Sequence, residues 1–250
     1  MTIRKVKEWW ERRNYEELKI RVWSTLKKRF LDRSEYSLHV SPCGRVTAEP
    51  REQKDKLVVQ LSTGCFDMDK QEVYEGDVVR TDEGNWTGVV VFAEGKFYLA
   101  GLNGGFSSGP GVAWNYSKIT GNILQDGSGV KSRFKRLIGS SFKVRVWSVF
   151  ERRHLKPGEY WLKVQKSGRL VAVPNKVDRL VIQMFTGCLD SEGRDVYEGD
   201  IIETDREERG CVIYRDCSFC SLDRRLIGEE LNRLNIHRLG NIGENEYLMR

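Results

Sequence analysis

The sequence predicts a mainly β protein made of two small β barrels or rolls in tandem, preceded by an N-terminal amphipathic helix. Three observations lead to this fold class: a long internal repeat, short apolar stretches separated by turn residues, and one leading segment with helical periodicity. Hydrophobic residues make up 39% and charged residues 31% of the chain, which is typical of a globular protein.

The internal repeat covers most of the chain. The segment TGCFDMDKQEVYEGDVV, which begins at Thr63, returns as TGCLDSEGRDVYEGDII at Thr186, and RVWS occurs at both Arg21 and Arg145. A repeat of this length indicates duplication of a whole domain, and each copy is long enough that we expect it to close its own core. The predicted boundaries are a helix over 1–17, a β domain over 18–125, a linker over 126–140 and a second β domain over 141–250.

Matching short strands are predicted in both copies. Residues 19–23 and 143–147 alternate polar and apolar side chains, whereas 57–61 and 180–184 are rich in β-branched residues. Turn residues recur about every ten positions between such stretches, which favours a small barrel or roll in each copy.

The leading segment has an apolar stripe. Ile3, Val6 and Trp10 recur at helical spacing, so we expect the helix to dock on the domain that follows. The alternative is an aromatic and basic arm that stacks on bases. The segment lacks the apolar core of a secretion signal, and no run of about 18 apolar residues exists, so we expect a cytoplasmic protein without a membrane partner.

The cysteines are predicted to be thiols. Only Cys65 has an equivalent in the other copy, Cys188. Cys217 and Cys220 have the CxxC spacing of a zinc or redox site, with Cys211 and His237 as conceivable further ligands. Because the first copy has no matching thiol pair, we predict no metal and no cofactor. An enzyme or zinc protein with an asymmetric site in the second domain remains the alternative.

Positive charge is concentrated in the linker. The net charge is +6, and about half of this excess lies in the Gly- and Ser-containing stretch 126–140. A solvated linker is one explanation, and an arm that follows phosphates is the other. Basic residues also occupy the same predicted turn in both copies and are candidate macromolecule contacts. The candidates are Lys28, Arg29, Arg152 and Arg153 in the turns, and Lys131, Arg133, Lys135 and Arg136 in the linker.

The order of these motifs resembles a known family. In each copy RVW is followed by a strand that ends in Thr-Gly, then by Asp, a polar hairpin, Tyr-Glu-Gly-Asp, a β-branched pair and a closing Gly-Asn-Ile. This order is similar to the YopX-like family of phage and prophage proteins. The resemblance implies an SH3-like β-roll in each copy, a phage-derived accessory role in the host cytoplasm, and no catalytic residues to transfer.

The family hallmark has its own physical interpretation. Glycine permits a backbone conformation that other residues avoid, so the hallmark predicts a turn into a strand, with its aspartate bonded to local amides and its tyrosine closing a barrel end. The alternative is a pair of carboxylates for a metal or for acid–base chemistry. The residues are Tyr74, Glu75, Gly76 and Asp77 in the first copy and Tyr197, Glu198, Gly199 and Asp200 in the second.

The sequence therefore predicts a non-enzymatic binding module. Two rolls joined by a basic linker would engage a host or phage macromolecule, either a protein or a nucleic acid. A nucleic-acid-binding protein that uses the basic turns and linker is one alternative, and the asymmetric enzyme or zinc site is the other. A structural variant of the binding module, in which the two halves pack as a pseudo-dimer and several chains assemble into a homo-oligomer, is a further alternative.

Overall fold

The fold is known from a computed structural model. The predicted helix over 1–17 lies outside the described residues, and so do Lys131, Arg133, Lys135 and Arg136 of the linker. The structure describes residues 18–51, 54–81, 86–93, 95–102, 106–108, 114–125, 138–139, 142–174, 179–215, 218–221 and 235–249.

The described part of the chain consists of β-strands and two short 3₁₀ helices, and it contains no α-helix. The first copy has β1 (Ile20–Ser24), β2 (Arg29–Phe30), β3 (Tyr36–Val40), β4 (Val46–Pro50), β5 (Leu57–Phe66), β6 (Glu72–Tyr74), β7 (Asp77–Thr81), β8 (Thr87–Ala93), β9 (Lys96–Gly101), β10 (Phe106–Ser108), η2 (Trp114–Tyr116) and β11 (Ser117–Asn122). The second copy has β12 (Val144–Ser148), β13 (Arg153–Leu155), β14 (Tyr160–Val164), β15 (Leu170–Pro174), β16 (Leu180–Leu189), β17 (Asp195–Tyr197), β18 (Asp200–Thr204), β19 (Arg209–Arg215), β20 (Ser218–Ser221), β21 (Ile236–Asn241) and η4 (Glu246–Met249).

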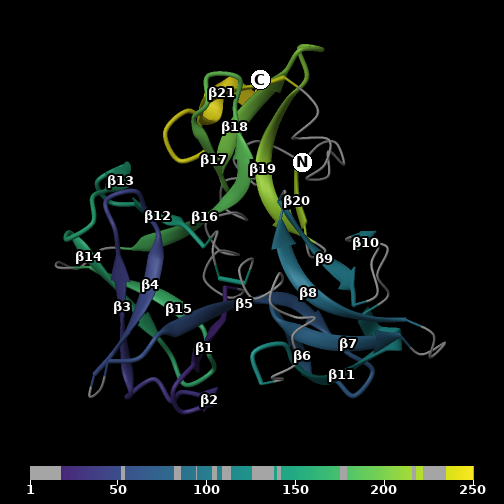
Figure 1. Ribbon diagram of the computed structural model, residues 1–250. Helices are drawn as coiled ribbons and strands as arrows, with labels where there is room; N and C mark the ends of the chain where they lie inside the picture. Colours follow the sequence, from purple (N-terminus) through teal and green to yellow (C-terminus); the bar gives the residue numbers. More distant parts are fainter. Residues whose placement is uncertain are drawn as a thin grey trace.

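The two copies follow the same plan, which confirms the mainly β class. A sheet β2-β1-β5-β6 in the first copy corresponds to β13-β12-β16-β17 in the second, and the hairpin β3-β4 corresponds to β14-β15. The remaining strands join across the copies into one nine-stranded sheet in the order β11-β7-β8-β9-β20-β19-β18-β21, with β10 on β9 (Figure 1). The junction is short, because Ser218 pairs with Lys96 between β20 and β9.

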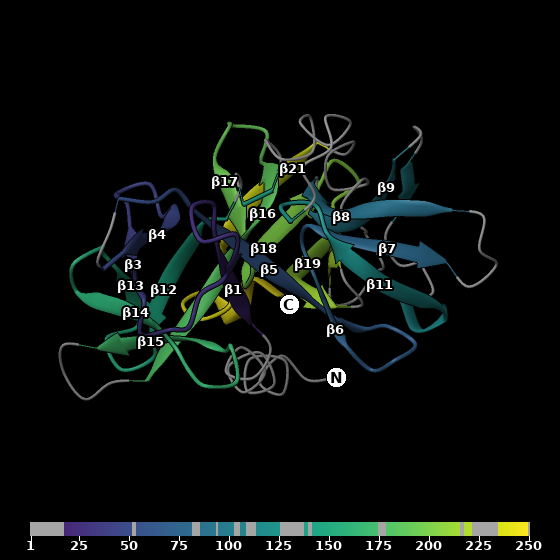
Figure 2. The ribbon, with the colours of Figure 1, turned by 60° about the horizontal axis from the view of Figure 1, so that its bottom comes forward.

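Each hairpin docks on the other copy. The Val144 N–H of the second copy donates to the carbonyl of Gly44, in the β3-β4 hairpin, at 2.8 Å. The equivalent bond has the two copies in exchanged roles: the Ile20 N–H of the first copy donates to the carbonyl of Gly168, in the β14-β15 hairpin of the second copy, at 3.0 Å. Both views place the two hairpins side by side (Figures 1 and 2). We call this reciprocal docking the exchange of hairpins; each hairpin also contacts a strand of its own copy, β4 with β5 and β15 with β16.

The main hydrophobic core is shared by the two copies. The expectation that each copy closes its own core is wrong for this cluster, because the exchanged hairpins carry apolar side chains from one copy into the other. Smaller clusters lie beside it, one around Val89 in the first copy and one around Trp147 in the second. Fully or nearly buried members of the shared core include Ile20, Val22, Leu61 and Phe97 of the first copy and Val144, Val146, Ile202 and Phe219 of the second.

Gly44→Ala is expected to destabilise the protein more than Gly168→Ala. Both glycines have a positive φ, 80° and 83°, so alanine at either position costs about 1–3 kcal/mol of backbone strain. A Cβ at position 44 would also lie 2.5 Å from the carbonyl oxygen of Val144, whereas a Cβ at position 168 meets its nearest atom, the carbonyl oxygen of Ile20, at 3.5 Å. Urea unfolding of the two variants checks this order, and equal losses would contradict the close approach at Gly44.

Candidate functional site: hallmark network and hairpin groove

The hallmark of the first copy forms a buried polar network centred on Asp77. Its carboxylate is 1% exposed and accepts a 2.9 Å bond from the backbone N–H of Tyr74 and a 3.1 Å bond from Asn122 Nδ2. Arg21 forms an ion pair with the same carboxylate, and its Nε donates to Gln60 Oε1 at 2.9 Å. The guanidinium also lies 4.5 Å from the centre of the Tyr74 ring.

The second copy repeats this network around Asp200. The carboxylate accepts the backbone N–H of Tyr197 at 2.9 Å and forms an ion pair with Arg145, which lies 4.6 Å from the Tyr197 ring centre. Burial lowers the pKa of Arg145, although Asp200 opposes this shift. The position equivalent to His154 in the first copy is not a histidine. The Nε2 atom of His154 lies 2.9 Å from Gln183 Oε1, and burial lowers the pKa of His154 to about 4.

These contacts give the hallmark a structural role. Gly76 and Gly199 have φ values of 83° and 82°, as a turn into a strand requires. The aspartate of each copy bonds the turn and an arginine from the first strand of the same copy. The hallmark tyrosines, Tyr74 and Tyr197, lie over those arginines, so the described contacts show them stacked on a cation.

Glu75 and Asp77 bond to different parts of the protein. Its side chain is buried, and Oε1 accepts the backbone N–H of Gly139, a residue of the linker, at 3.1 Å. Burial raises its pKa to about 8, so the group is mostly neutral at pH 7. The equivalent Glu198 accepts the backbone N–H of Tyr214 at 3.4 Å. In the described contacts, Glu75 and Asp77 thus belong to two separate hydrogen-bond networks and do not form a carboxylate pair.

The basic turns are partly occupied by ion pairs within the chain. Arg29 pairs with Glu35 at 2.6 Å, and the equivalent Arg153 pairs with Glu159 at 2.7 Å. Lys28 and Arg152 are exposed at turn positions with φ of 51° and 53°. A macromolecule-binding role for these residues stays a prediction, as does such a role for the linker cations.

Among the cysteines that the structure describes, one differs from the expectation that all are thiols. Cys65 is disulfide-bonded, whereas Cys43, Cys188, Cys211 and Cys220 are thiols. Cys217 lies outside the described residues, and His237 Nδ1 lies 2.7 Å from Ser191 Oγ. Among the residues that the structure describes, no group of three or more His, Cys, Asp or Glu side chains could hold a metal ion.

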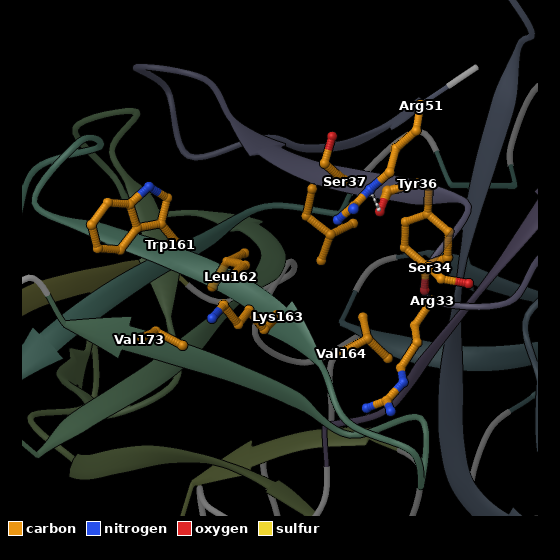
Figure 3. Close-up of a pocket in the computed structure, with 11 residues that line it drawn as sticks. Arg33, Ser34, Tyr36, Ser37, Arg51, Trp161, Leu162, Lys163, Val164 and Val173 are labelled. Carbon is orange, nitrogen blue, oxygen red and sulfur yellow. Dashed lines mark hydrogen bonds between the residues drawn. The ribbon is translucent and has the colours of Figure 1, made fainter. Parts of the chain in front are cut away.

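A groove opens where the exchanged hairpins meet. It has a volume of about 640 Å³ and lies between β3 of the first copy and β14 of the second (Figure 3). Its lining residues are Arg33, Ser34, Tyr36, Ser37, Leu38 and Arg51 of the first copy and Trp161, Leu162, Lys163, Val164 and Val173 of the second. None of these residues is among the candidate contacts predicted from the sequence. We call this site the hairpin groove.

Polar and aromatic groups surround an apolar floor in the hairpin groove. Tyr36 and Leu162 are 5% exposed and form part of the floor, and burial raises the pKa of Tyr36 to about 12. Trp161 is 56% exposed. Arg51 Nε donates to the backbone carbonyl of Tyr36 at 3.2 Å, which holds the guanidinium at the groove (Figure 3). The arrangement can bind a ligand that combines negative charge with a flat apolar surface.

The family comparison agrees with the duplication. The family model described as YopX protein matches residues 10–128 and again 143–250. A solved structure, protein EF1440 from Enterococcus faecalis, is 21% identical, with a match that covers 44% of this chain and 98% of that chain at a TM-score of 0.31. No curated protein matches. Within the described residues, no helix is long and apolar enough to cross a membrane. Because the family model matches in two separate segments, the chain belongs to the YopX protein family, with two of its domains in tandem.

Proposed function

We propose that the chain is a non-enzymatic, phage-type accessory protein of the cytoplasm, whose two SH3-like β-rolls together engage a macromolecule through the hairpin groove. The observation that carries this proposal is the position of the groove. Both copies supply its walls, so the reciprocal exchange of hairpins creates a surface that one copy does not have by itself.

The hallmark residues support binding rather than catalysis. Asp77 and Asp200 are each 1% exposed, and each forms an ion pair with an arginine and accepts a turn amide, so neither carboxylate is accessible to a substrate. A catalytic acid or base must reach the proton that it transfers. The exposed side chains of the groove, in contrast, are accessible to a large partner.

Affinity isolation with the full chain tests the proposal. We expect wild-type protein to retain a partner that Trp161→Ala/Lys163→Glu loses, since both side chains line the groove and are exposed. The matched control is Tyr116→Ala/Lys118→Glu, which removes an exposed aromatic ring and reverses an exposed charge at η2 and β11. Retention of the same molecules by all three proteins would contradict a binding role for the groove.

A further inference from the structure

We infer, on the basis of the proposed function, that the hairpin groove binds single-stranded nucleic acid. The cations of the groove would contact phosphates, and a base would stack on Trp161. Single-stranded DNA and RNA share this chemistry. The inference assigns a partner class and a recognition mode to residues that lie outside the basic turns and the linker.

The charge of the groove is of one sign. Arg33 and Arg51 come from the first copy and Lys163 from the second, and none of the lining residues carries a carboxylate. Glu35, which is near Arg33 in sequence, is bonded to Arg29 and Lys27. The groove therefore complements an anion on both of its walls.

Two carboxylates near the lining residues do not reverse this charge. Glu49 lies opposite Ser37 in the β3-β4 hairpin but does not line the groove. Glu159, which precedes β14, is bonded to Arg153. Phosphate contacts with arginine and lysine supply most of the affinity of proteins for nucleic acid without sequence preference. Three such contacts also make the affinity dependent on salt.

Trp161 favours a nucleic acid over an acidic peptide. It lies on β14 between Tyr160 and Leu162, which are 4% and 5% exposed, so the buried neighbours anchor the strand while the indole faces outward. The equivalent position in the first copy is Ser37, which also lines the groove. An exposed indole beside cations is a stacking platform for bases, and every base has a flat face that can use it. The carboxylates of an acidic peptide would use the cations but not the ring.

The size of the groove favours a single strand. A volume of about 640 Å³ is in the range that holds a small-molecule ligand. Such a space admits a short stretch of unpaired nucleotides, and a duplex would present its bases already stacked within the helix. We therefore expect single strands to bind more tightly than duplexes of the same length.

Fluorescence anisotropy with the full chain tests the inference. The probes are labelled oligo-dT, labelled oligo-U and a labelled duplex of equal length, each titrated over a series of salt concentrations. We expect the logarithm of the binding constant for single strands to fall with the logarithm of salt concentration with a slope of about −2, as three phosphate contacts imply. Trp161→Ala should weaken binding about tenfold. Arg33→Ala/Arg51→Ala/Lys163→Ala should abolish most of the salt dependence.

Two control variants locate the contact. Lys28→Gly/Arg152→Gly removes two exposed cations at positions with positive φ, where glycine is the residue least strained, and Tyr116→Ala removes an exposed ring on η2. Both are expected to bind single strands like wild type. Loss of binding in Lys28→Gly/Arg152→Gly with retention in Trp161→Ala would place the contact at the basic turns and overturn the inference.

A second probe separates this inference from the proposed function. Labelled oligo-glutamate is titrated into the same proteins. If it binds through the groove and no oligonucleotide binds, the nucleic-acid inference is overturned while the proposed function stands. Absence of oligonucleotide binding to the wild-type protein, or unchanged binding by Trp161→Ala and the triple variant, also overturns it. Failure of the proposed function itself is detected by the affinity isolation described above.

Discussion

Asp200→Ala is expected to destabilise the protein by about 3–5 kcal/mol, the usual cost of removing one partner of a buried ion pair. The carboxylate of Asp200 is 1% exposed, is paired with Arg145 and also accepts the backbone N–H of Tyr197. Its removal leaves the Arg145 guanidinium and the turn amide of Tyr197 buried without this acceptor. Arg238 lies 4.0 Å from Asp200 and would then add repulsion rather than compensation.

A matched control for this prediction lies on the same strand. Glu203 of β18 forms an ion pair with Arg209 at 2.7 Å, but the two side chains are 25% and 45% exposed. Exposed ion pairs contribute about 0–1 kcal/mol, so Glu203→Ala should cost little. Urea unfolding of both variants measures the difference. If Asp200→Ala costs no more than Glu203→Ala, the Asp200 network does not support the fold as described.

Glu75→Gln is expected to remove a large pH dependence of stability. The pKa of Glu75 is raised by burial to about 8, whereas an unperturbed glutamate titrates near 4.5. Between these two pH values the folded state binds more protons than the unfolded state, so the wild-type free energy of unfolding falls as pH rises from about 4.5 through 8. The full difference is roughly 5 kcal/mol from the size of the shift. Glutamine stays neutral and can still accept the Gly139 N–H, so the variant should be the more stable protein at pH 9.

The free energy of unfolding of both proteins at pH 5, 7 and 9 checks this prediction. Glu35→Gln serves as the control, because Arg29 and Lys27 lower the pKa of Glu35 to about 2 and the stability that it contributes is lost as pH falls. Glu35→Gln should therefore lower stability by a similar amount at pH 5, 7 and 9, and it should leave the fall in stability between pH 5 and pH 9 unchanged. A wild-type protein that is as stable at pH 9 as at pH 5 would show that Glu75 is not buried as a neutral acid.

The mainly β class could be predicted from the local pattern of apolar and turn residues, and the duplication could be predicted from the sequence repeat. The contacts that the hallmark residues make could not be predicted from the sequence. Arg21 alternates with Ile20 and Val22, which predicts only that it lies on the other face of the strand, whereas its partner Asp77 is 56 residues away. A pairing over that distance depends on how β1, β5 and β7 are brought together, and local periodicity does not contain this information.

The exchange of hairpins was hidden by the repeat itself. The strand that receives a hairpin has nearly the same sequence in both copies, since RVWS begins at both Arg21 and Arg145. Docking within one copy and docking across the copies are therefore equivalent in local sequence. The hairpin groove was missed for the same reason, because it exists only where the two hairpins meet. Its one sequence signal was the asymmetry of Trp161, which replaces a serine of the first copy.

The measurement that tests the central claim most directly is the folding of separated copies. The chain is divided within the linker into residues 1–132 and 133–250, and each fragment is produced alone and together with the other. Because the main core contains residues of both copies, we expect neither fragment to form a folded monomer, and we expect the mixture to recover β structure and one cooperative unfolding transition as a one-to-one complex. Two fragments that each unfold cooperatively as monomers, with unchanged midpoints after mixing, would contradict a fold held together by exchanged hairpins.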